Sequence, residues 1–211
     1  MHINNDPRSV HRIAVTATVE IVSGVTAADL DRPTPCAGWN LADLLTHMTV
    51  QHRGFAAAAR GAGADLALWE PATVAEAVCA DPNGAYAAAA AEVLAAFAVD
   101  GVLDATFALP EFGQDAAVPG AMAIGFHFVD YVVHGWDVAR SIGAPFTLPA
   151  EVIDAVLPLA FAVPDGEFRD MDNSPFARAV AQPDDATDLE RVLRHLGRSP
   201  AWRAEGVIAG R

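Results

Sequence analysis

The chain has 211 residues and a formal net charge of −14, with 27 acidic residues against 13 basic ones, all of which are arginine. A protein this acidic lacks the basic surface that binds nucleic acid or an anionic membrane, so we expect neither as a partner. Its length and its 53% hydrophobic content indicate one domain with a packed core, and the abundance of alanine favours helix.

The two cysteines, Cys36 and Cys79, form neither a CxxC pair nor a disulfide framework, which excludes a structural zinc cluster of the cysteine type. The first residues lack the basic region and apolar core of a signal peptide. The longest apolar runs contain proline and are too short to span a bilayer. We therefore expect a cytoplasmic protein.

Helical periodicity is expected at seven places along the chain. In order, they are residues 9–23, 40–60, 74–80, 84–98, 120–142, 149–163 and 187–196. Asn40 is a good N-cap for the second segment, and Asp43 follows at the capping-box position. The stretch DPNG, residues 81–84, is interpreted as a turn between the third and fourth segments. One short extended piece is expected around residues 105–109.

These segments show no alternating strand–helix pattern and no internal repeat, so the simplest architecture is an all-α helical bundle with four long helices. We expect residues 1–165 to form the bundle and residues 166–211 to form a C-terminal extension packed on it. In such bundles, metal and ligand sites are built from side chains on facing helices.

The stretch HFVDYVVHGWDVAR, residues 127–140, places three ligand-type side chains in an apolar helix. His127, Asp130 and His134 lie within about 60° of one another around a helix, and Asp130 and His134 have the i, i+4 spacing that grips one metal ion. Zinc sites that keep an open position usually take three protein ligands. Candidates for the remaining ligand on another helix are His2, His11, His47, His52 and His195, and His47 is the best placed.

An ordinary structural explanation exists for each of these residues. Asp130 and His134 could simply satisfy each other as a local pair, and a buried histidine needs only one hydrogen-bond partner. His127 taken alone fits a core or surface position more simply than a ligand position.

Four further residues have two interpretations each. Trp39 and Trp136 could line a substrate pocket or could anchor loops by packing. Asp137 could orient a ligating histidine, or could lie on the surface as a partner for Arg140. Cys36 could be redox-active or lie near the site entrance, or it could simply pack in its proline-rich loop.

Two motifs make the sequence resemble a known family. They are PTPCAGWNLADLLTHM, residues 33–48, and HFVDYVVHGWDVARSIG, residues 127–143. Together they resemble the mycothiol-dependent maleylpyruvate isomerase N-terminal domain family, within the DinB-like superfamily of metal-binding four-helix bundles. The tail from residue 172 resembles the actinobacterial metal-binding subgroup. The resemblance implies that His47, Asp130 and His134 bind a divalent metal, usually zinc and sometimes nickel.

Two departures from the family pattern bear on function. The isomerase has Glu where this chain has Asp130, which is one methylene shorter, so His127 could replace Asp130 or join it as a neighbouring group. The isomerase also has a C-terminal domain, whereas this chain ends about 45 residues after its fourth long helix. Maleylpyruvate isomerisation itself is therefore not the expected activity.

The leading functional hypothesis is a metal-dependent enzyme that uses a small thiol, with mycothiol implied by the resemblance. The metal would activate the thiol, which would add to a small electrophile in S-transferase or thiol-dependent isomerase chemistry. One alternative is a non-catalytic metal-binding or sensing bundle. Another is an interaction module with a vestigial site, for which a homodimer is left open.

Overall fold

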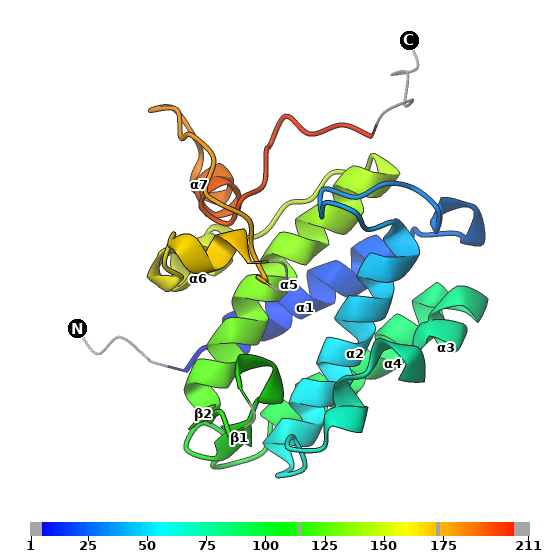
Figure 1. Cartoon of the computed structure of the whole chain (residues 1–211), viewed down its shortest axis with the longest axis vertical. Helices are drawn as coiled ribbons and strands as arrows, with labels where there is room; N and C mark the ends of the chain where they lie inside the picture. The colour runs from blue at the N-terminus through cyan, green and yellow to red at the C-terminus, as the bar shows by residue number, and fades with distance from the viewer. Residues whose placement is uncertain (1–5, 114, 172–173, 205–211) are drawn as a thin grey trace.

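A computed structural model describes residues 6–113, 115–171 and 174–204. Four helices form the main bundle (Figure 1): α1 (Arg8–Val22), α2 (Leu41–Ala59), α4 (Pro82–Phe97) and α5 (Gly120–Ile142). The short helix α3 (Ala75–Ala80) precedes α4. Helix α6 (Ala150–Ala162) packs on α5 and α1, and α7 (Asp188–His195) packs on α6. The expected all-α bundle is confirmed.

The connections contain one small antiparallel hairpin and several 3-10 turns. Strands β1 (Thr106–Ala108) and β2 (Ala117–Pro119) pair with Phe107 opposite Val118. The 3-10 turns in the described ranges are Ala27–Asp29, Leu66–Trp69, Pro71–Thr73, Pro110–Phe112 and Glu167–Asp170. The extended piece expected around residues 105–109 corresponds to β1, whereas β2 is not predicted from the sequence.

The prediction of a turn at residues 81–84 is wrong, because the DPNG stretch is the first turn of α4. The Asp81 side chain caps the helix by accepting a hydrogen bond from the Gly84 N–H at 2.9 Å, and Pro82 occupies the first helical position. Proline is favoured there because the missing N–H has no intrahelical partner anyway. The same residues that favour a turn thus also favour a helix start.

The helix ends that bound the site follow the expected local chemistry. Asn40 and Asp43 form the reciprocal capping box at the start of α2. Gly143 ends α5 at φ 71°, a left-handed conformation that glycine adopts without steric cost. These caps set where α2 begins and where α5 ends.

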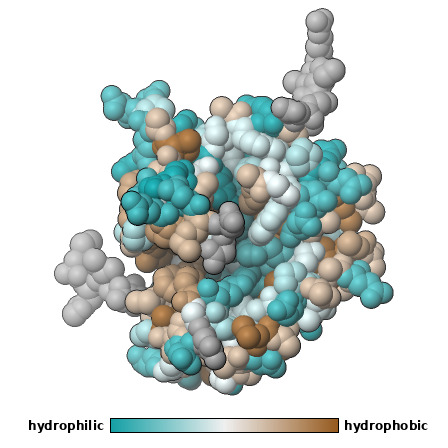
Figure 2. Space-filling model, viewed as in Figure 1, coloured by the Kyte–Doolittle hydropathy of each residue, from teal (hydrophilic) through white to brown (hydrophobic). Residues whose placement is uncertain are grey.

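The outer surface mixes hydrophilic and hydrophobic residues, and Figure 2 shows no single continuous apolar patch on the face in view. Large hydrophobic side chains with considerable exposure are scattered over several elements, as is normal for the surface of a folded chain. Within the described residues, every helix is too short or too polar to cross a membrane.

Close contact between α5, α1 and the loop after α5 depends on Gly135. A Cβ atom at this position would lie 2.7 Å from Phe146 Cζ and 2.8 Å from Thr18 Cγ2. We expect Gly135→Ala to reduce the free energy of unfolding by about 1–3 kcal/mol through overpacking. Gly125→Ala is the matched control, since the nearest atom to its Cβ is Leu159 Cδ1 at 3.8 Å. Urea unfolding of both variants tests this, and equal stability of the two would contradict the argument.

A chain of three buried histidines joins α1, α5 and α2. His11 Nε2 lies 2.8 Å from His127 Nδ1, and His127 Nε2 lies 3.1 Å from His52 Nδ1. His11 is 1% exposed, and His127 and His52 are both 0% exposed. The ring of Tyr131 stacks on both His127 and His52, with centroids 4.0 Å apart in each case.

The histidine chain is directional, because a neutral imidazole carries only one N–H. His52 Nε2 is buried and has no hydrogen-bond partner among the described residues. If His52 Nδ1 donates to His127, which donates onward to His11, the unpartnered Nε2 carries no proton. The opposite direction would bury an unpaired N–H, which costs stability.

Candidate metal centre

Helices α2 and α5 bring His47, Asp130 and His134 together. The Asp130 carboxylate lies between the two imidazoles, with Oδ1 3.2 Å from His134 Nε2 and Oδ2 3.9 Å from His47 Nε2. One ligand atom from each residue lies within 4.8 Å of the other two. In a tetrahedral zinc site, ligand atoms about 2.0–2.2 Å from the ion are roughly 3.3–3.6 Å apart. The three side chains therefore need only small adjustments to hold one ion.

The donor set and its exposure fit a divalent metal. Two imidazoles and one carboxylate are ligands that zinc and nickel both accept. The side chains of His47 and Asp130 are 28% and 22% exposed, whereas that of His134 is 5% exposed. The group is thus anchored on its inner side and reachable from solvent on its outer side, which leaves room for an exogenous ligand.

Charge and burial compete at these three residues. Burial alone would raise the pKa of Asp130, but His134 and His47 outweigh it and hold that pKa well below the ordinary value. Burial alone would lower the pKa of His134, but the charges of Asp130 and Cys36 and the hydrogen bonds that His134 donates to Asp130 and Asp137 raise it well above 6.5. The carboxylates therefore stabilise positive charge at this position, whether a proton or a metal ion supplies it.

A second group of side chains fixes the orientation of His134. Asp137 is fully buried, and its Oδ2 lies 3.0 Å from His134 Nδ1, which leaves Nε2 directed toward Asp130. Arg198, which follows α7, donates through Nη2 to Asp137 Oδ2 at 3.0 Å and to Cys36 Sγ at 3.1 Å. The Cys36 thiol donates to Asp137 Oδ2 at 3.2 Å. The loop before α2, helix α5 and the C-terminal segment all meet at this carboxylate.

Cys36, His134 and Asp137 also offer ligand atoms within 4.8 Å of one another. The guanidinium of Arg198 already supplies a positive charge to the thiol and the carboxylate of this group. A metal ion there would lie beside a buried cation, which is electrostatically unfavourable. The group of His47, Asp130 and His134 is therefore the better metal candidate.

Comparison with known proteins places the chain in a family. The sequence model described as the mycothiol maleylpyruvate isomerase N-terminal domain matches residues 11–139, which is more than half of the chain. The chain belongs to this family. The matched range includes all three candidate ligands and ends before Arg198.

Relatives of this family member are similar over most of its length. Two uncharacterised proteins of Mycobacterium tuberculosis, from strains CDC 1551 / Oshkosh and ATCC 25618 / H37Rv, are each 30% identical over 197 residues. These alignments cover 92% of this chain and 98% of each relative.

Solved structures of the mycothiol-dependent maleylpyruvate isomerase share the fold. The crystal structure of that enzyme gives a TM-score of 0.55 at 16% identity, and that of a histidine-to-alanine mutant gives 0.53 at 15%. Both matches cover 71% of this chain and 65% of the isomerase chain, so the match spans less than two thirds of that enzyme. At this level of identity, the likeness establishes the architecture alone.

The structure separates the other residues that the sequence offered as candidates for the site. His127 Nδ1 contacts His11, and His127 Nε2 contacts His52. These three imidazoles therefore do not converge on the candidate metal centre. His195 Nε2 lies 2.9 Å from the Val163 carbonyl oxygen. His2 lies outside the described residues.

The two tryptophans lie on different sides of α5. Trp39 is 38% exposed, and its ring centroid is 5.0 Å from that of His47, so it borders the candidate centre. Trp136 lines a cavity on another side of the helix. Asp137 contacts His134 and Arg198 and is fully buried, so it is neither a surface residue nor the partner of Arg140.

Sequence reasoning missed two residues beside the centre. Gln51 lies one turn after His47 on α2 and donates to Glu111 Oε1 at 2.7 Å. Burial raises the pKa of Glu111, and the hydrogen bond from Gln51 and the charge of His47 partly offset this rise. Glu111 comes from the 3-10 turn Pro110–Phe112 between β1 and β2, and its sequence surroundings carry no motif that would reveal its position.

Proposed function

We propose that this family member binds one divalent metal ion through His47, Asp130 and His134 and uses it to activate a small thiol toward an electrophile. The observation that supports this most directly is the convergence of three suitable ligands, two of them partly open to solvent, in a chain of the mycothiol maleylpyruvate isomerase family. Zinc is the first candidate, nickel the second, and mycothiol the natural thiol to test.

A divalent metal held by these residues would lower the pKa of a thiol or water bound to it. The chain supplies orientation around it. Asp137 would accept a hydrogen bond from His134 Nδ1–H, which leaves Nε2 as the nitrogen that would bind the metal. Trp39 provides an exposed aromatic wall beside His47 for the body of the substrate.

A thiol that reacts as a thiolate must give up its proton, and Glu111 is the carboxylate available to receive it. It lies close enough to His47 and Asp130 to respond to their charges, and its raised pKa makes it a better base than an ordinary carboxylate. The Gln51 amide holds it in place. Glu111 would thus act as a base and not as a metal ligand.

Metal content per chain tests the ligand set. The protein should be purified without a metal-binding tag, incubated with zinc or nickel, desalted and subjected to elemental analysis. We expect about one ion per chain in the wild type and none in His47→Ala. Glu111→Gln is the matched control, since it alters a neighbour of the site and not a ligand, and should keep about one ion.

Thiol binding is then measured on cobalt-substituted protein, in which thiolate ligation adds a charge-transfer band in the near ultraviolet. Mycothiol should produce this band in the wild type. Stoichiometric metal without the band would contradict thiol activation and support a metal-binding or sensing bundle. No bound metal in the wild type would contradict the proposal at its first step and support an interaction module.

A further inference from the structure

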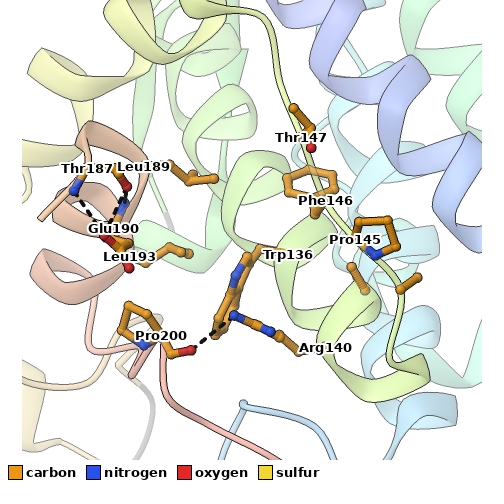
Figure 3. A pocket seen from close by; sticks show the side chains of 12 residues that line it. Trp136, Arg140, Pro145, Phe146, Thr147, Thr187, Leu189, Glu190, Leu193 and Pro200 are labelled. Carbon is orange, nitrogen blue, oxygen red and sulfur yellow. Dashed lines mark hydrogen bonds between the residues drawn. The ribbon is translucent and has the colours of Figure 1, made fainter.

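A cavity of about 330 Å³ lies on the side of α5 that faces away from the candidate metal centre. Trp136 and Arg140, which line it, are about 200° and 240° around the helix from His134. Figure 3 shows α7 with Leu189 and Leu193 on one side of the cavity and the segment with Phe146 on the other. Its volume is within the roughly 300–1,000 Å³ range typical of small-molecule sites.

The guanidinium of Arg140 is the main polar group of this cavity. Its Nη2 donates to the Pro200 carbonyl oxygen at 3.0 Å, and the group lies over the Trp136 ring, 5.2 Å from its centroid. Its Nε is buried and has no hydrogen-bond partner among the described residues. Within the same residues, no carboxylate lies within 4.0 Å of this guanidinium, although the chain carries 27 acidic residues.

The charges around the cavity favour an anion. Burial, and after it the charge of Arg203, lower the pKa of Arg140, whereas the charge of Glu190 acts in the opposite direction. Glu190 is the one acidic residue that lines the described cavity. Its Oε2 accepts hydrogen bonds from the N–H and hydroxyl of Thr187 at 2.9 and 3.1 Å and caps α7, so this carboxylate is already engaged.

We propose that this cavity binds a small organic carboxylate with an apolar body about the size of one aromatic ring. The carboxylate pairs with the guanidinium of Arg140, which has no carboxylate partner among the described residues. The apolar body contacts Phe146, Leu189 and Leu193, which line the cavity. The site is separate from the candidate metal centre, so the inference does not depend on the proposed metal or thiol.

The probe is 3-phenylpropionate, and its neutral amide, 3-phenylpropanamide, is the matched ligand control. Binding is followed by two-dimensional NMR of the indole N–H groups of the four tryptophans, with the Trp136 signal identified from Trp136→Phe. We expect a saturable shift of the Trp136 signal with the carboxylate. The amide should bind at least tenfold more weakly, because it lacks the charge that Arg140 pairs with.

Three variants locate the interaction. Arg140→Gln should weaken carboxylate binding at least tenfold, whereas Arg12→Gln, at an exposed arginine of α1, should leave it unchanged. Glu190→Gln removes a nearby negative charge but can still cap α7, and should tighten binding. Equal binding of carboxylate and amide, a shift of the Trp39 signal in place of Trp136, or no saturable shift would each overturn the proposal.

Discussion

Lowering the pH from 6 to 5 is expected to reduce the free energy of unfolding of the metal-free protein by about 3–4 kcal/mol. The cause is the buried chain of His11, His127 and His52. Burial lowers the pKa of His11 from 6.5 to about 3, and burial together with the neighbouring imidazoles lowers the pKa values of His52 and His127 well below 6.5. The charge of Asp130 acts in the opposite direction on both but is outweighed.

The loss of stability at lower pH follows from the number of protons that the folded and unfolded states bind. Below pH 6.5, the unfolded chain protonates its histidines while the folded chain keeps these three neutral, so the unfolded state binds more protons and gains stability as pH falls. Each such histidine contributes about 1.4 kcal/mol per pH unit once the pH is well below 6.5. Against a total stability of about 5–15 kcal/mol, three together are a large effect.

The three histidines dominate the interval from pH 6 to pH 5, and Glu111, whose pKa is raised in the folded state, acts in the opposite direction. His134 has a raised pKa in the folded state, so it is protonated in both states here and adds little. The Asp130 and Asp137 carboxylates have lowered pKa values and lose their stabilising contribution mainly at lower pH, near the unfolded carboxyl pKa of about 4 and below.

Urea unfolding at several pH values in the presence of a chelator measures the slope. His52→Phe should reduce the slope by about one third, because one of three proton-binding differences is removed. His195→Gln is the matched control at a half-buried histidine outside the chain and should keep the wild-type slope. A wild-type slope of one proton or less in this interval would contradict the neutral histidine chain.

Local signals in the sequence were sufficient for most of the helices. The capping box at Asn40 and Asp43 and the left-handed Gly143 depend only on neighbouring residues, so the ends of α2 and α5 can be located without the fold. The 81–84 stretch shows the limit of this reasoning. Aspartate and proline favour both a turn and a helix start, and only the length of chain that packs behind them decides between the two.

The site was predictable to the extent that helical spacing determines it. The i, i+4 spacing of Asp130 and His134 places them on one face from sequence alone. Spacing also placed His127 near that face, but the helix turns just enough to direct its ring to His11 and His52 instead. The roles of Glu111 and Arg198 depend on contacts across 60 or more residues, which periodicity does not encode.

Asp137 is expected to affect both metal affinity and stability, whereas Arg198 is expected to affect mainly stability. Arg198 is 6% exposed and Asp137 is fully buried, so removing Asp137 leaves a buried guanidinium without a carboxylate, and removing Arg198 leaves Asp137 with His134 as its remaining basic partner. We expect Arg198→Met and Asp137→Leu each to reduce the free energy of unfolding of the metal-free protein by about 3–5 kcal/mol. The double variant should recover most of this loss, because two apolar side chains replace the pair.

Metal affinity should follow a different pattern across the same variants. Asp137→Leu and the double variant both remove the acceptor for His134 Nδ1–H, so each should bind zinc about 10–100-fold more weakly. Arg198→Met keeps that acceptor and should change affinity less than tenfold. Competition with a chromophoric chelator gives the affinities, and urea unfolding of the metal-free proteins gives the stabilities. If affinity recovers in the double variant along with stability, Asp137 contributes to the fold alone and does not orient His134 toward the metal.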